Sequence, residues 1–174
     1  MPAKYEPPTG WIVQAYCFTL DPSAEQEAAM KRFFGARRMA YNWALDVILE
    51  ELAHHRATGE KVPYPNMYRL RKRWNIEKST LCVNSYTGEV WWPQVSKGAF
   101  ADGIRGAVGA YWNWQKSRSG QISGRPVGFP KYKKRGKDRD RCTFTTGAMR
   151  VGADRRHLTL PVIGAVRTTK TLER

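Results

Sequence analysis

The chain begins and ends in stretches typical of β-strands, with long helical periodicities between them. Residues 11–20, WIVQAYCFTL, alternate loosely between apolar and polar positions and are rich in β-formers, so they predict one strand. Residues 141–151 and 157–168 have the same character and predict further strands separated by turns. One strand before the helical region and several after it predict a β-domain into which a helical bundle is inserted.

A long amphipathic helix is predicted directly after the first strand. Asp21 offers a helix N-cap and Pro22 suits the first helical position. The apolar residues that follow lie within about 60° of one line on a helix, and the pattern ends near residues 54–59. Arg37 falls inside this apolar face, so its guanidinium must pair with a carbonyl or a carboxylate such as Glu77, or emerge to meet a phosphate. The sequence leaves both alternatives open.

Two further helices are predicted in the middle of the chain. Residues 66–74, NMYRLRKRW, predict a short basic helix, and residues 75–94 predict an irregular region with a turn at 86–88. Residues 96–115 place apolar side chains on one helical face at spacings of 4, 3, 4 and 3. An adjacent face carries only small residues: Ala99, Gly103, Gly106 and Ala110. This strip indicates the close approach of a neighbouring helix or of a nucleic-acid backbone.

Positive charge is concentrated in the last third of the chain. The 174 residues contain 30 Lys and Arg against 15 Asp and Glu, a formal net charge of +15. Residues 1–115 hold 14 basic and 11 acidic groups, whereas residues 116–174 hold 16 basic and 4 acidic groups. Because clustered like charges repel, this density favours binding to a polyanion, and nucleic acid is the obvious one.

The densest run is residues 125–141, RPVGFPKYKKRGKDRDR, which we call the basic segment. A solvated loop that serves solubility is the alternative interpretation. Phe129 and Tyr132 argue against it, since aromatic residues among cations can stack on bases or attach a loop to a core. The prolines and glycine of the segment interrupt the amphipathic helix that membrane-surface binding needs, so no membrane partner is predicted.

The remaining composition predicts a reduced intracellular protein without catalytic residues. No apolar run is long enough to span a membrane, and the first residues lack a signal-peptide pattern. Cys17, Cys82 and Cys142 are odd in number and widely spaced, which argues against disulfides and a zinc knuckle. His54 and His55 have no carboxylate at metal-binding spacing, and no phosphate-cradling glycine motif occurs. The sequence therefore predicts no catalytic site, no metal site and no cofactor.

Three stretches of the chain resemble one family in their order and their residues. The first is FTLDPSAEQ followed by FGARRMAYNWAL, with an Arg-x-x-Tyr-Asn signature at Arg38, Tyr41 and Asn42. The second is the helix VSKGAFADGIRGAVGAYWNW, and the third is GFPKYKKRGKDRDRCTFTTG, with Gly128, Phe129 and Pro130 at its start. Together they resemble the N-terminal part of TnpB proteins, which insertion sequences encode, and of compact type V CRISPR effectors.

The resemblance implies an α+β fold in three parts. Residues 1–20 would supply the first strand of an oligonucleotide-binding-like β-barrel, the wedge domain, which would be incomplete in this chain. Residues 21–120 would form an inserted helical recognition domain, and residues 121–174 the basic segment and the remaining wedge strands. Family members continue into a RuvC-like nuclease domain with three acidic metal ligands, so the chain is expected to be a fragment, a truncation or one part of a split protein.

The resemblance also implies partners and site residues. The partners would be a guide RNA, target double-stranded DNA and the remainder of the parent chain, whose nuclease domain would hold Mg²⁺ when active. The expected DNA contacts come from the helical region and one later strand: Tyr64, Tyr68, Arg69, Lys97 and Thr145. The expected RNA contacts come from the basic segment: Lys131, Tyr132, Lys133, Lys134, Arg135, Lys137 and Arg139. Ala101 replaces a polar residue of the family, so a DNA motif different from that of other members is expected.

Two other functions remain open from the residues alone. An autonomous helix-turn-helix protein of a mobile element would use residues 66–74 as its recognition helix and would bind symmetric half-sites. A general RNA-binding protein would explain the charge without a DNA target. The resemblance implies a location in the prokaryotic cytoplasm, in association with nucleic acid.

Overall fold

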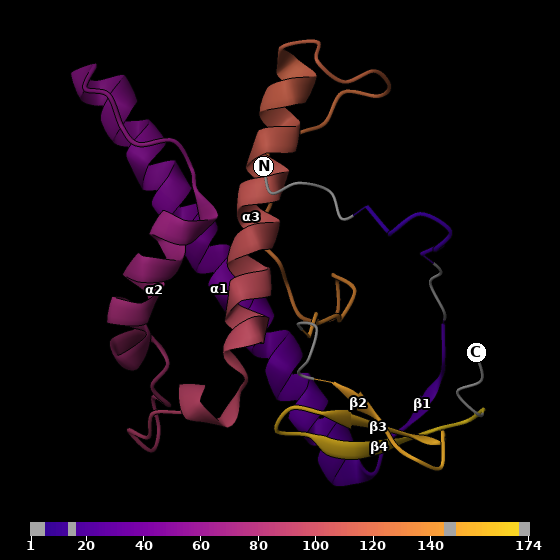
Figure 1. The fold of residues 1–174 in the computed structure, drawn as a ribbon. Coiled ribbons are helices and arrows are strands. Elements are labelled where there is room, and N and C mark those ends of the chain that lie inside the picture. Colours follow the sequence, from indigo (N-terminus) through magenta and orange to yellow (C-terminus); the bar gives the residue numbers. More distant parts are fainter. Residues whose placement is uncertain (1–5, 14–16, 145–148, 171–174) are drawn as a thin grey trace.

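The computed structural model describes residues 6–13, 17–144 and 149–170. These residues form three α-helices, one 3-10 helix and a small four-stranded antiparallel sheet, as Figure 1 shows. The predicted α+β class is confirmed. In Figure 1 the sheet lies next to the beginning of the first helix, and the second helix lies on the other side of the bundle.

The first helix, α1, spans Ala24–Thr58. Ser23 and Gln26 form a capping box in which each side chain accepts a hydrogen bond from the other residue's backbone N–H. The predicted start at Asp21 is therefore two residues early, because Asp21 belongs to a strand and Ser23 has the reciprocal partner three residues on. Gly59 ends the helix in the left-handed conformation, as the pattern predicted.

The helix α3 spans Lys97–Arg118, is capped by Ser96 and packs along α1. The predicted strip of small residues faces α1, which confirms the neighbouring-helix alternative. A Cβ added at Gly103 would lie 2.3 Å from the carbonyl oxygen of Arg37, so the two helices touch backbone to backbone. The core formed between them contains aromatic and aliphatic side chains: Phe33, Tyr41, Leu45, Ile48, Phe100, Ile104 and Tyr111.

The helix α2 spans Met67–Leu81, seven residues beyond the predicted end at Trp74. Asn66 caps it by accepting hydrogen bonds from the backbone N–H groups of the second and third helical residues. Glu77 of this extension forms an ion pair with Arg73, which lies one turn earlier on the same face of the helix. The irregular region is therefore shorter than predicted, and it contains the expected turn and the 3-10 helix η1, Trp92–Gln94.

The sheet contains β1 (Leu20–Asp21), β2 (Arg150–Val151), β3 (His157–Leu160) and β4 (Gly164–Thr168). Their order is β1-β4-β3-β2, and all pairs are antiparallel. The strands on either side of the helical region in sequence are thus neighbours in one sheet.

The sheet is smaller than the sequence predicted. Of the strand expected over residues 11–20, the described residues 11–13 and 17–19 are not in a strand, and Trp11, Ile12 and Val13 are exposed. Of the strand expected over 141–151, residues 141–144 are also irregular. Cys142 and Phe144 pack against the core without joining a strand, and the Phe144 ring lies 5.6 Å from that of Phe33. Trp11, Ile12 and Val13 pair with no strand among the described residues, so β-propensity alone does not bring them into the sheet. Residues 14–16 and 145–148 lie outside the described part. The four strands form an open sheet, and the closed barrel stays a prediction.

None of the helices in the described residues is long and apolar enough to cross a membrane.

Two of the three cysteines are protected from solvent. Cys82 is buried and Cys142 is half-buried, and burial raises the pKa of each thiol to about 11. Only the thiolate reacts with alkylating reagents, so at pH 8 about one in a thousand of these thiols is reactive. Iodoacetamide at pH 8 is therefore expected to label the exposed Cys17 first, as followed by intact-mass spectrometry. Labelling of Cys82 and Cys142 should accelerate about tenfold per pH unit below their pKa. Equal labelling rates at all three cysteines in the native protein would contradict this prediction. The urea-unfolded chain, in which all three thiols are exposed, serves as the reference for equal rates.

Candidate nucleic-acid interface

Three polar residues on α1, spaced four apart, hold the basic segment against the helix. Arg38, Asn42 and Asp46 share one helical face because residues four apart lie one above another. Arg38 pairs with Asp140, Asn42 bonds the backbone of Lys133, and Asp46 accepts a hydrogen bond from the hydroxyl of Tyr132. We call this face the α1 polar stripe.

Asn42 makes the central attachment. Its Nδ2 donates to the carbonyl oxygen of Lys133 at 3.0 Å, and its Oδ1 accepts from the backbone N–H of Lys133 at 2.7 Å. The Lys133 ammonium lies 5.4 Å from the centre of the Tyr41 ring. One side chain thus satisfies both backbone groups of Lys133, which fixes the segment in place on the helix.

Asp138 closes a tight turn within the basic segment. It accepts hydrogen bonds from the backbone N–H of Lys134 at 2.7 Å and from the Lys133 ammonium at 2.9 Å. These contacts, the backbone hydrogen bond first, lower the pKa of the Asp138 carboxyl. The two acidic residues of the segment, Asp138 and Asp140, therefore bind Lys133 of the segment and Arg38 of α1.

Two aromatic residues complete the attachment. Phe129 packs edge-on against Trp114 of α3 with ring centres 4.8 Å apart. The hydrogen bond that the Tyr132 hydroxyl donates to Asp46 raises the pKa of Tyr132. The structure therefore brings four of the signature residues into one attachment: Arg38, Tyr41, Asn42 and Phe129. Pro130, which follows Phe129, is half-buried. Gly128 lies in open space and contributes no contact of this kind.

The attachment leaves most cations of the basic segment exposed. Of the residues expected to bind RNA, five are exposed and have no carboxylate partner in the part of the chain that the structure describes: Lys131, Lys134, Arg135, Lys137 and Arg139. Lys133 differs, because Asp138 holds its ammonium. Arg32, Arg38 and Arg135 also border a hollow of about 410 Å³ between α1 and the segment. This surface can accept several phosphates side by side.

The residues expected to bind DNA lie in different surroundings. Tyr64 and Tyr68 are exposed, with Tyr64 packed against the Trp112 ring at 5.9 Å. Arg69 is bound by Glu51 through two hydrogen bonds of 2.5 and 2.8 Å, and this pairing raises its pKa. Its guanidinium is thus already neutralised within the protein. Thr145 lies outside the described residues.

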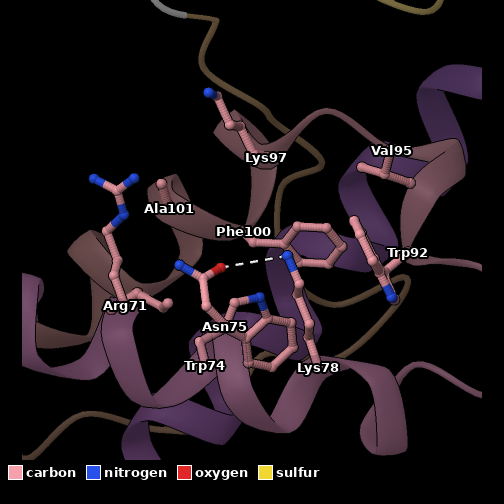
Figure 2. A pocket seen from close by; sticks show the side chains of 10 residues that line it. Arg71, Trp74, Asn75, Lys78, Trp92, Val95, Lys97, Phe100 and Ala101 are labelled. Atoms are coloured by element: carbon pink, nitrogen blue, oxygen red, sulfur yellow. Dashed lines mark hydrogen bonds between the residues drawn. The ribbon is translucent and has the colours of Figure 1, made fainter.

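Lys97 is exposed on the first turn of α3, at the rim of a cavity that also contains Arg71 and Lys78 (Figure 2). The sequence analysis missed Arg71 and Lys78. Their spacing of seven residues, with Trp74 between them, is a helical signal that could have shown a shared face.

The structure shows which of the two alternatives for Arg37, an internal partner or a phosphate contact, is correct. Its side chain is buried and pairs with Asp102 of α3 at 2.6 Å. The partner is therefore a carboxylate, but it is not Glu77, which binds Arg73 and the indole N–H of Trp43 instead.

His54 and His55 both contact Glu60, through its carboxylate at 2.9 Å and its carbonyl oxygen at 2.7 Å. The sequence did not indicate the contact between His54 and Glu60, which forms because the chain reverses after Gly59. No group of three metal-ligating side chains occurs among the residues described.

Comparison with known proteins gives one family model and several similar proteins. A model described as a helix-turn-helix domain, of the OrfB type in the insertion sequence IS605, matches residues 12–57. Two proteins of Mycobacterium tuberculosis, from strains CDC 1551 and H37Rv, are 53% identical over all 174 residues, which cover 38% of their length. A protein of Escherichia coli K12, InsQ, is 26% identical over 155 residues, 89% of this chain and 33% of its own length. All three are named as candidate RNA-guided DNA endonucleases.

These matches confirm the resemblance drawn from the three sequence stretches. The chain spans about two-fifths or less of the length of these relatives. The matched residues 12–57 contain, where described, the short strand β1 and nearly all of the continuous helix α1. Two helices joined by a short turn, which define a helix-turn-helix, are not formed by the described residues of that stretch.

Proposed function

Because this chain fits the N-terminal portion of a TnpB-like protein, we propose that it is the nucleic-acid-binding part of an RNA-guided DNA-binding protein. In this proposal it holds a guide RNA and reads a short motif in duplex DNA, after which guide pairing reads the remaining target. The main observation behind the proposal is that the α1 polar stripe holds the basic segment in place and leaves most of its cations exposed.

The basic segment is the proposed RNA site. Phosphate contacts position a nucleic acid without reading its sequence, and they need cations that are held in place and have no internal partner. The five exposed cations of the segment meet that requirement. Lys133 and Tyr132 are engaged by Asp138 and Asp46, so their proposed role is to position the segment.

The helical region is the proposed DNA site. Lys97 stands free at the start of α3, and Tyr64 and Tyr68 are exposed on the connection into α2 and on its first turn. Together with Thr145, these three residues would contact the DNA duplex that contains the short motif. Arg69 would contribute indirectly, since Glu51 holds its guanidinium.

The sheet is the proposed start of the wedge domain. β1 pairs with β4 across the helical insertion, which supports an oligonucleotide-binding-like barrel completed by residues outside the four described strands. The domain limits proposed are those of the sequence analysis, with residues 1–20 and 121–174 on either side of the recognition helices. A RuvC-like domain of the parent protein would supply Mg²⁺-dependent cleavage.

The proposal is tested by RNA recovery and salt dependence. The chain is purified from its native locus context, and the RNA protected from nuclease is sequenced; a discrete RNA with a fixed scaffold and a variable end is expected. Replacing Lys131, Lys134 and Arg135 by Gln should then lower the slope of log affinity for this RNA against log salt by up to about 0.7 per lost contact.

A charge-matched variant separates position from total charge. Arg56, Lys61 and Lys72 are exposed cations away from the segment, and replacing them by Gln should leave the slope nearly unchanged. Equal slopes for both triple variants would remove the basic segment as the RNA site. Absence of protected RNA, together with binding to a symmetric duplex, would instead favour the autonomous DNA-binding protein.

A further inference from the structure

A cavity of about 120 Å³ lies between α2, η1 and the start of α3 (Figure 2). Its inner wall is aromatic: the rings of Trp74 and Phe100 pack 5.2 Å apart, and Trp92 stands at one side. Arg71, Lys78 and Lys97 border it from two helices. The cavity therefore joins a rigid apolar wall to three cations.

These cations lack carboxylate partners, unlike their neighbours on α2. Arg69 pairs with Glu51 and Arg73 pairs with Glu77, whereas no ion pair to Arg71, Lys78 or Lys97 occurs within the described residues. No acidic residue lines the cavity. The amide oxygen of Asn75 is the acceptor at 3.4 Å from the Lys78 ammonium, which also lies 3.9 Å from the centre of the Trp92 ring. Hydrogen-bond donors thus outnumber acceptors at this site.

A buried donor in the cavity wall has no acceptor. Trp74 is 2% exposed, and its indole N–H makes no hydrogen bond in the structure. In Figure 2 the indole nitrogen lies on the ring edge nearest to Asn75 and Phe100. A buried donor without an acceptor costs free energy. The indole nitrogen has almost no accessible surface, so the Trp74 ring acts as a wall of the cavity and its N–H resonance reports on what binds there.

We propose that this cavity binds one backbone phosphate of duplex DNA. A phosphodiester offers only acceptor oxygens and carries one negative charge, which matches a site made of a guanidinium and two ammonium groups over an aromatic wall. Duplex DNA is favoured over RNA because Lys97, the proposed DNA contact, borders the cavity, and because α2 and the basic segment lie on opposite sides of α3 in Figure 1. The inference rests on the proposed function. It adds a phosphate anchor, made by Arg71 and Lys78, beside Lys97.

The first test is the salt dependence of DNA binding. The probe is a mixed-sequence DNA duplex, with single-stranded RNA as the comparison. Replacing Arg71 and Lys78 by Gln should lower the slope of log affinity for DNA against log salt by about 0.9, the value for one phosphate, and leave the slope for RNA unchanged. The matched control replaces Lys72 and Arg105 by Gln, since both are exposed on the same two helices and neither lines the cavity. An unchanged DNA slope in R71Q/K78Q, a fall for RNA alone, or an equal fall in the control would overturn the inference.

The second test does not depend on DNA binding. Inorganic phosphate is titrated into the ¹⁵N-labelled chain, and the indole N–H resonance of Trp74, assigned by its absence in Trp74→Phe, is followed. A saturable shift in the native chain that is lost in R71Q/K78Q is expected. If the native chain binds no duplex but this shift occurs, the proposed function fails while the anion site stands. If duplex binding occurs and phosphate leaves the resonance in place, the assignment of this cavity is wrong.

Discussion

Replacing Asp102 by Ala is expected to lower the free energy of unfolding by about 3–5 kcal/mol, because it leaves the Arg37 guanidinium buried without a counter-charge. The side chain of Arg37 is 6% exposed and that of Asp102 is 14% exposed, and they meet at 2.6 Å between α1 and α3. Water cannot replace the lost carboxylate without opening the contact between these helices. Urea unfolding followed by far-UV circular dichroism measures the change.

Two controls separate the buried pair from ion pairing in general. Glu27→Ala removes the partner of Lys31 on the exposed face of α1, where both side chains are more than half exposed, and should cost less than about 1 kcal/mol. Arg37→Met combined with Asp102→Ala removes both charges and should recover much of the loss, because the unpaired charge dominates the penalty. A D102A variant as stable as the native chain would show that Arg37 reaches solvent.

Replacing Gly103 by Ala is expected to destabilise the chain by about 3 kcal/mol, at the upper end of overpacking penalties. The added Cβ would stand 2.3 Å from the Arg37 carbonyl oxygen and 3.0 Å from both the Ala40 Cβ and the Tyr41 backbone nitrogen. Two of these three atoms are backbone atoms of α1, so no side chain can rotate away and the helices must separate. The midpoint of urea unfolding should fall accordingly.

Gly109 of the same helix provides the matched control. A Cβ there meets nothing within 4 Å, so Gly109→Ala should stabilise α3 by up to about 1 kcal/mol through helix propensity alone. Gly106 lies between these cases, since its Cβ would meet side-chain atoms of Tyr41 and Arg37 at 3.3 and 3.4 Å. Loss of stability in G109A equal to that in G103A would contradict the assignment of the close contact to Gly103.

The signature residues show how much of the candidate site could be predicted from the sequence. Arg38, Tyr41 and Asn42 were singled out by a resemblance, which gave them no physical role. The structure supplies one, because Asn42 binds the backbone of Lys133, 91 residues later, and Arg38 binds Asp140. A contact between residues so far apart leaves no periodic trace in the sequence, so only the packed structure reveals it.

The strands show what local sequence patterns cannot determine. Residues 11–13 have the composition of a strand, yet they are exposed and form no strand in the described part of the chain. Residues 157–168 were predicted as one strand, but they form the hairpin of β3 and β4 with a turn at 161–163. Strand formation depends on a partner and a covered face, which other parts of the chain supply. Apolar alternation indicates the β-character of a stretch, but it does not show where the chain folds back on itself.

The sequence by itself determined the approximate positions of the three helices and the concentration of positive charge, because 3.6-residue periodicity and net charge are local or additive properties. Tertiary structure alone decided which cations are neutralised. Arg37 and Arg69 are bound by Asp102 and Glu51 across helix contacts, while Lys97 and the exposed cations of the basic segment have no carboxylate partner among the described residues. Ion pairing requires two groups within about 4 Å, and that distance is set by how the helices pack.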